Sequence, residues 1–445
     1  MHKIINIKCD EDIIFDRLAY TIEFINSHPL KPHNVLFRLN NIAPNAETLY
    51  YKSSPNNTPF VPAQNLFFSS ALYPNPVINN YNFECETVYS VEKVKKEYSD
   101  FFTGGKYGFD IFETVFYHIS RYEEVYCSIE KLDIHKRMKS SEQLLVKNEL
   151  HYSPVVDSLV FCFFKSLGIV AKDKETTFSL THDIDIIRKY SSFYKSLKSI
   201  AKIIQMNLGF SGMARIIKSL LNTFQNTEND PYFTYNWLFV KDKKFVNKTV
   251  YFVAGGNTRY DLYDKYYLKQ MPEILKKAMD SNYKIGYHPS YEAYNTKKLF
   301  QKEYNLLEGF VNTKILNIRT HYLRLDIQRS FELFEEFGLE YDSTLGYADD
   351  IGFRCGTGFE YNPYNFKEER AWRFREIPLV FMDSSLIYSV CRDNIDCFKA
   401  KAKAFFKLNK HNTHITINFH NSTFDYSLEF RNGLKEFYME LISEI

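Results

Sequence analysis

The sequence predicts an α/β protein of two domains, and three observations lead to that fold class. The chain has 445 residues, which is too long for one ordinary domain and sufficient for two. Hydrophobic residues make up 45% of it and charged residues 25%, a balance typical of globular proteins. Beyond residue 175, short apolar runs alternate with stretches of helical periodicity, which indicates parallel strands joined by helices in an open or closed sheet.

Residues 1–150 predict a smaller accessory α/β domain of unknown role. Short apolar runs such as Val35–Phe37 alternate there with turns rich in Pro and Asn. Residues 109–122 place apolar side chains at helical spacing. Residues 151–175 are expected to form a second helix, Pro154–Gly168, and a polar linker. We find no set of metal ligands in this half of the sequence, and no nucleophile with its base.

Residues 176–445 predict the repeated order of strand and helix. The expected strands are short apolar runs with polar ends, at 178–181, 249–253, 284–287, 316–319 and 415–419. Expected helices include Pro272–Asp280, with Pro in the first turn, and Gln328–Phe337. In parallel α/β folds the functional site lies at the carboxyl ends of the strands. The unusual polar residues of this chain fall there.

Residues 188–240 interrupt the alternation and predict an inserted helical hairpin. Leu197, Ile200 and Ile204 share one helix face, and lysines occupy another face, at positions 195, 198 and 202. A solvated lysine face is the simpler interpretation. The alternative is weak contact with an anionic membrane surface or a lipid-linked substrate.

The composition disfavours a nucleic-acid partner. Lys and Arg number 56 against 54 Asp and Glu, a net charge of +2, which provides no basic surface for a phosphate backbone. The seven cysteines lack the spacing of a zinc ribbon or redox motif and are expected to be reduced thiols. The sequence shows no signal peptide and no transmembrane segment of about 18 apolar residues, so we expect a cytoplasmic protein.

The first chemical motif is Thr181-His182-Asp183-Ile184-Asp185, at the end of an expected strand. Two carboxylates two residues apart on a strand point the same way and repel each other unless a cation lies near them. The pair therefore suits one metal ligand and one general base. Considered alone, a helix cap and turn would explain it equally well.

Three further strand ends carry residues of the same chemistry. His288 follows the strand at 284–287, and His420 follows the last strand. Arg319 ends the strand at 316–319 and His321 follows it, and an arginine beside a carboxylate can hold that carboxylate ionised. Each residue alone has a structural explanation, whereas their common placement favours one site.

The order of these motifs resembles the metal-dependent polysaccharide deacetylases, also called the nodulation-protein-B or carbohydrate esterase family four domain, over residues 175–445. The resemblance implies a distorted (β/α) barrel that uses zinc or another divalent ion to hydrolyse N- or O-acetyl groups on sugars. The preceding half, with residues 109–124, resembles an uncharacterised domain found upstream of such deacetylases.

The resemblance also implies the metal ligands, Asp185 and His288. The family has a second histidine four residues after the first, and this sequence has Glu292 there. A catalytic zinc needs three protein ligands and an open position. We prefer His321 to Glu292 as the third ligand, since it belongs to the same layer of strand ends.

The remaining roles come from the same resemblance. Asp183 would be the general base and Arg319 its partner. The backbone N–H of Tyr322 would hold the oxyanion, and His420 would be the general acid. Other residues could contact a sugar or be structural: Asp342, Arg354 and Trp372.

The expected function is metal-dependent removal of acetyl groups from an N-acetylated or O-acetylated sugar of a surface polysaccharide or its precursor. Two alternatives stay open at this point. One is hydrolysis of another non-peptide C–N bond on the same scaffold. The other is a non-catalytic carbohydrate-binding protein whose metal site has decayed. Sequence alone leaves the sugar, the metal and the oligomeric state open.

Overall fold

The computed structural model describes residues 3–9, 13–40, 43–44, 46–52, 60–62, 111–190, 209–261 and 265–445. The chain forms two compact units, each built from separate segments. Unit 1 consists of Met1–Thr177, Gly352–Pro378 and Phe405–His414. Unit 2 consists of Phe178–Ile351, Leu379–Ala404 and Ile415–Ile445. The domain limits expected from the sequence stay predictions.

Unit 1 contains, within the described residues, a four-stranded parallel sheet in the order β2-β1-β3-β4. Its strands are β1 (Lys3–Cys9), β2 (Val35–Leu39), β3 (Glu47–Lys52) and β4 (Phe60–Pro62). Its helices are α1 (Phe15–Ser27), α3 (Ile111–Ile119), α4 (Tyr122–Val125), α5 (Leu144–Lys147) and α6 (Val155–Ser166). Three short strands belong to its later segments, β10 (Tyr364–Asn365), β11 (Arg370–Ala371) and β12 (Arg375–Glu376). The helices expected at 109–122 and 154–168 are confirmed as α3 and α6.

Helix α3 lies in the core of unit 1, and every one of its nine residues is buried. Its sequence IFETVFYHI is apolar on most sides, which is typical of a helix enclosed on all faces. The Phe112 ring contacts Tyr51 of β3 and Phe163 of α6, both with ring centres 5.6 Å apart. Burial lowers the pKa of His118 in this helix to about 3, so that imidazole stays neutral.

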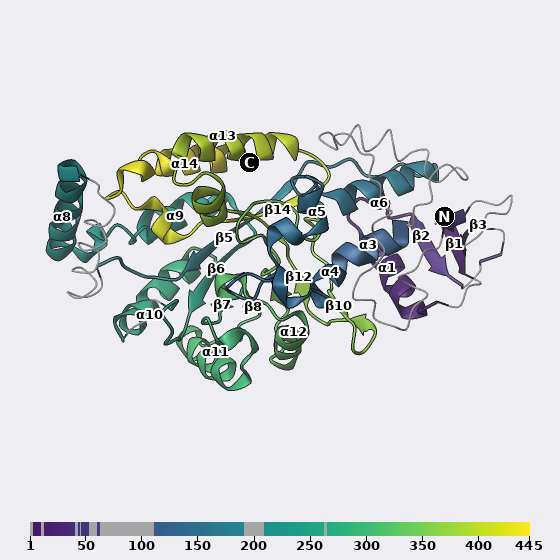
Figure 1. Cartoon of the computed structure of the whole chain (residues 1–445), viewed down its shortest axis with the longest axis horizontal. Helices are drawn as coiled ribbons and strands as arrows, with labels where there is room; N and C mark the ends of the chain where they lie inside the picture. The colour runs from purple at the N-terminus through teal and green to yellow at the C-terminus, as the bar shows by residue number, and fades with distance from the viewer. Residues whose placement is uncertain are drawn as a thin grey trace. The chain divides into compact units, whose positions relative to one another are not determined.

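Unit 2 is built on parallel strands. In the described part of the chain, seven strands of this unit lie side by side in the order β9-β8-β7-β6-β5-β14-β13. They are β5 (Thr177–Ile184), β6 (Lys248–Val253), β7 (Lys284–His288), β8 (Asn317–Ile318), β9 (Tyr341–Asp342), β13 (Leu379–Met382) and β14 (His414–Asn418). Every neighbouring pair with a defined register among them is parallel. The mixed α/β class is therefore confirmed, with a sheet that curls as half of a barrel (Figure 1).

The central strands are buried because helices cover the sheet. All six residues of β6, Lys-Thr-Val-Tyr-Phe-Val, are buried, as in strands covered on both faces. Among the described residues, the helices of unit 2 are α8 (Gly209–Gln225), α9 (Tyr235–Lys241), α10 (Lys265–Asp280), α11 (Lys297–Val311), α12 (Ile327–Glu336), α13 (Ile395–Leu408) and α14 (Leu434–Glu444). The helix expected at Gln328–Phe337 is confirmed as α12.

Two expectations from the sequence are wrong. Pro272 does not begin a helix, since it lies inside α10, which starts at Lys265. The tertiary packing of α10 evidently outweighs the backbone hydrogen bond that proline removes. Cys391 and Cys397 are not reduced thiols, because they form a disulfide, with their Cα atoms 5.6 Å apart. The loop between them brings the two sulfur atoms together, although their spacing matches no common motif.

Parallel strands bring their carboxyl ends to one edge of the sheet, and the polar motifs follow those ends. Asp183 lies near the end of β5 and His288 ends β7. Arg319 follows β8 directly, and His420 follows β14 by two residues. The lysine-bearing stretch around residues 195–204 lies outside the described residues. No helix in the described part of the chain is long and apolar enough to cross a bilayer.

Candidate metal centre

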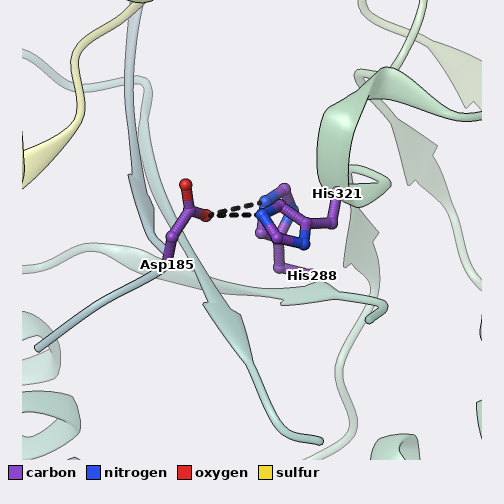
Figure 2. Close-up of side chains that lie close together, drawn as sticks. All are labelled: Asp185, His288 and His321. Atoms are coloured by element: carbon purple, nitrogen blue, oxygen red, sulfur yellow. Dashed lines mark ion pairs between the residues drawn. The ribbon is translucent and has the colours of Figure 1, made fainter. Parts of the chain in front are cut away.

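Asp185 and two histidines converge at the carboxyl edge of the sheet in unit 2. The Oδ1 atom of Asp185 lies 3.2 Å from Nε2 of His288 and 3.7 Å from Nε2 of His321. Figure 2 shows both imidazoles pointing at this one carboxylate oxygen. One ligand atom from each of the three residues lies within 4.8 Å of the others, which is compact enough to hold one metal ion.

The hydrogen bonding of His288 favours a metal-binding tautomer. Its Nδ1 lies 2.5 Å from the backbone carbonyl oxygen of Arg319 and must donate a proton to it. In the neutral imidazole, Nε2 then carries a lone pair directed at the cluster. Histidines that ligate metals commonly donate their other N–H to a carbonyl or carboxylate in this way.

Asp261 lies on the other side of His321. The Nδ1 atom of His321 lies 3.7 Å from Oδ1 of Asp261. Asp261 in turn accepts hydrogen bonds from the backbone and hydroxyl of Thr258, at 3.0 and 2.7 Å, and from the amide of Tyr291 at 2.9 Å. Gly256 permits this approach, because a Cβ there would lie 2.4 Å from Cγ of Asp261, and its φ is +108°.

The residues present fit a divalent cation. Oδ1 of Asp185 is buried and accepts no well-formed hydrogen bond from any described residue, which leaves a buried acceptor for another partner. Burial alone would raise the pKa of Asp185, but the imidazoles of His321 and His288 lower it well below its ordinary value. One carboxylate oxygen and two imidazole nitrogens are a ligand set that catalytic zinc uses, with a fourth position open.

Asp183 has a different environment from Asp185. Its Oδ1 accepts a hydrogen bond of 2.8 Å from Arg319, and its Oδ2 accepts one of 3.0 Å from Asn418. Arg319 is fully buried, and it is further fixed by donating to the carbonyl of Ser343. Burial would raise the pKa of Asp183, and the guanidinium of Arg319 reverses this, so the pKa is lowered and the carboxylate stays ionised.

His420 faces both carboxylates. Its Nε2 lies 3.9 Å from Oδ2 of Asp183 and 3.8 Å from Oδ2 of Asp185. Its Nδ1 lies 2.7 Å from Oδ1 of Asp383, and its backbone amide donates to Oδ2 of the same residue. Burial would lower the pKa of His420, but Asp383 and the two other carboxylates raise it to about 10. The imidazole is therefore oriented and able to carry a proton.

Glu292 lies outside the group of possible metal ligands, and Tyr322 lies at a sharp turn of the backbone. The carboxylate of Glu292 lies 3.3 Å from the guanidinium of Arg324 and is half exposed, and it does not belong to the group that could hold a metal. Tyr322 adopts a left-handed backbone conformation with φ 60°, as does Leu323 after it with φ 52°. The structure thus turns sharply just beyond His321, where the oxyanion-binding amide was expected.

Three residues of this site were not identified from the sequence: Asp261, Asp383 and Asn418. A signal existed for Asp383, because it follows the four apolar residues of β13 just as the other site residues follow their strands. Asn418 is the last residue of β14 and could be found by the same rule. Asp261 lies in a loop after β6, and no local pattern points to it.

Three other residues considered as sugar contacts are buried: Asp342, Arg354 and Trp372, with exposed fractions of 0, 4 and 3%. Asp342 accepts a hydrogen bond from Thr344, and Arg354 donates to Glu124 within unit 1. These contacts favour structural roles.

Comparisons with known proteins give a family match and a structural likeness. Residues 6–170 match a family described as of unknown function, DUF7033. No curated relative matches the sequence. The structure is similar to the crystal structure of a protein from Mycobacterium smegmatis provisionally named a polysaccharide deacetylase, with 15% identity and a TM-score of 0.36. That match covers 61% of this chain and 84% of the other.

Proposed function

We propose that this chain is a metal-dependent hydrolase that removes an acetyl group from an acetylated sugar, with zinc as the metal. One observation carries the proposal: a candidate metal triad lies beside an ionised carboxylate and an oriented imidazole. The ion would be held by Asp185, His288 and His321. His420 lies within 4 Å of both Asp183 and Asp185. When bound, a divalent ion supplies Lewis acidity, which activates water and polarises the acetyl carbonyl.

The residues around the triad provide the proton transfers of amide hydrolysis. Asp183 accepts the proton of the attacking water, and Arg319 keeps the carboxylate ionised until then. His420 donates a proton from Nε2 to the departing amine, and Asp383 fixes the imidazole for this transfer through Nδ1. The amide of Tyr322 is proposed to donate to the oxyanion, an interaction that strengthens in the transition state.

An aromatic cluster beside the triad fits a sugar as the substrate. The Tyr322 ring lies 4.7 Å from that of His321 and 5.5 Å from those of Tyr260 and Tyr291. Tyr322 is 37% exposed, so its ring is accessible to a ligand. The apolar face of a pyranose packs against such rings.

The test compares two neighbouring carboxylates. We expect Asp183→Asn to retain bound metal and to lose roughly 10²–10⁴-fold in kcat for acetate release from N-acetylated sugar oligomers, because the proton acceptor is gone. Asp185→Ala should lose both metal and activity, because a ligand is removed. Asp280→Asn, an exposed change at the end of α10, is the control.

Metal content by mass spectrometry and acetate release are measured on the same preparations. A normal kcat in Asp183→Asn would refute the assignment of the base. Wild-type protein with bound metal but without acetate release would favour hydrolysis of a different C–N bond. Protein that binds sugar oligomers but takes up no divalent ion would favour a non-catalytic binder.

A further inference from the structure

Unit 2 contains a cavity of about 610 Å³ whose lining residues differ from those of the metal centre. The end of α8, the start of α9, the segment after His420 and the start of α14 enclose it. Its lining, all in the described part of the chain, includes no member of the triad or of the aromatic cluster around Tyr322. Pockets that hold small molecules in proteins have volumes of roughly 300–1,000 Å³. The cavity is therefore large enough for a small organic ligand.

Aromatic rings form much of the lining, and Trp237 on α9 is the largest of them. It is one of two tryptophans in the chain and is partly exposed, whereas Trp372 is only 3% exposed. The Trp237 ring contacts that of Phe424, with centres 5.0 Å apart. It also contacts Tyr438 of α14 at 6.0 Å, so α9 and α14 lie side by side (Figure 1). An indole that is fixed by neighbouring rings and still partly exposed can pack against the apolar face of a sugar.

Uncharged polar residues share the lining with this ring. Asn222 and Asn432 contribute side-chain amides, each of which can donate and accept hydrogen bonds. Tyr426 is 47% exposed, and its hydroxyl donates to the backbone carbonyl of Asn229. A sugar hydroxyl also donates and accepts, so amides match it, whereas an anion needs donors alone. The polar part of the lining therefore favours a sugar.

The charges around the cavity nearly balance. Its charged residues are two bases and three acids: Arg431, Lys435, Glu228, Asp230 and Glu436. Arg431 donates to the carbonyl of Ser422 at 2.6 Å, and the Lys435 ammonium lies 4.7 Å from the centre of the Trp237 ring. The Asp230 carboxylate accepts hydrogen bonds from three backbone amides, at 2.8 to 2.9 Å. This balance favours an uncharged ligand over an anion or a cation.

We propose that this cavity is a second carbohydrate-binding site, which takes an uncharged sugar unit of the polymer that the metal centre deacetylates. Trp237 would pack against the sugar ring, while Asn222 and Asn432 would bind its hydroxyl or acetamido groups. The lining residues Phe424 and Tyr426 follow His420 by only four and six residues. A second site of this kind would retain the polymer between reactions, because it raises the effective concentration of the chain. The identity of the sugar rests on the proposed function, whereas the site itself rests on the cavity.

Tryptophan fluorescence tests the proposal on the full chain. A Trp372→Phe background leaves Trp237 as the single indole. The probes are two neutral disaccharides, the dimers of N-acetylglucosamine and of glucose. We expect the N-acetylglucosamine dimer to shift the emission of Trp237 to shorter wavelength and to protect the indole from quenching by acrylamide, because the sugar displaces water from it. Tyr426→Ala and Asn432→Ala should each weaken this binding by about five- to tenfold.

The matched control is Tyr322→Ala, which removes a ring of comparable exposure, 37% against 47% for Tyr426, beside the triad. It should leave the Trp237 titration unchanged. Unaltered thermal unfolding in each variant shows that the fold is intact. Acetate release is measured on the same preparations. Binding of the dimer at Trp237 without acetate release would contradict the proposed function and support this site.

Three results would overturn the proposal. The first is that neither dimer changes the emission or the quenching of Trp237. The second is that the two cavity variants bind as tightly as the background protein, or that Tyr322→Ala weakens the Trp237 titration as much as they do. The third is that inorganic phosphate protects Trp237 and the sugars do not, because the cavity would then be an anion site.

Discussion

Asp183 and Asp185 are two residues apart, yet their surroundings assign them different chemistry. Asp183 has both oxygens occupied, by Arg319 and Asn418, whereas Oδ1 of Asp185 faces two imidazoles and accepts no well-formed hydrogen bond from the described residues. The sequence motif predicted one base and one ligand, and the contacts explain how the two differ. The catalytic and ligand roles themselves stay predictions.

At this scale Asp261 is predicted to be a positioning residue for His321. We expect Asp261→Asn to lower the affinity for zinc by about 10–100-fold, because the imidazole loses the carboxylate that orients it. Zinc affinity is measured by competition with a chelating dye. Because Asp261 also accepts hydrogen bonds from Thr258 and Tyr291, the variant should lose some stability, so zinc affinity is compared at a temperature where circular dichroism shows both proteins to be folded. Unaltered zinc affinity would show that the 3.7 Å contact has no such role.

At the scale of elements, the sequence predicts the strands that carry the site residues, but not the residues that contact those site residues from elsewhere in the chain. The runs at 249–253, 284–287 and 415–419 correspond to β6, β7 and β14, since uninterrupted apolar residues are typical of buried parallel strands. Asp261 was missed because it lies in a loop and its importance comes from its position beside His321, which is distant in sequence. Asp383 follows an apolar strand like the other site residues, but only the structure shows its contact with His420. Pro272 was misplaced because propensity yields to tertiary packing.

The buried helix α3 provides a prediction on stability. Phe112→Ala should lower the free energy of unfolding by about 3–5 kcal/mol, because it empties the space between β3 and α6. Denaturant unfolding measures the change. Phe15→Ala on α1 is the comparison, since Phe15 is 45% exposed and its loss should cost less than about 1 kcal/mol. Equal effects of the two changes would contradict the packing described for α3.

At the scale of the whole molecule, buried charge makes stability depend on pH. Burial would raise the pKa of Glu124 in unit 1, but Arg354 and Arg121 lower it to about 2 from an ordinary 4.5. Since the pKa of Glu124 is lower in the folded protein than in the unfolded chain, the stabilisation that comes from its ionised carboxylate is fully present above pH 4.5. It is lost progressively as pH falls toward about 2.

Glu124→Gln tests this dependence. We expect a loss of about 3–5 kcal/mol in unfolding free energy at neutral pH, because the two arginines lose their buried counter-charge. The difference from the wild type should shrink as pH falls from 4.5 toward about 2, where the wild-type carboxylate is also protonated. Denaturant titrations across this range measure it. A difference that stays constant with pH would argue against an ionised Glu124.

The segmented make-up of unit 1 limits how the protein can be divided. A truncated protein made of residues 6–170 would contain Arg17, which is 2% exposed, without Glu369, to which its guanidinium donates at 2.9 and 3.1 Å. The fragment also loses Tyr364 and Phe366, which contact the ring of Phe116, so it would expose apolar surface that the full chain buries. We therefore expect that fragment to lack a cooperative melting transition by circular dichroism, and to regain one when a peptide of residues 352–378 is added. A cooperative transition in the fragment alone would show that it folds without that complement.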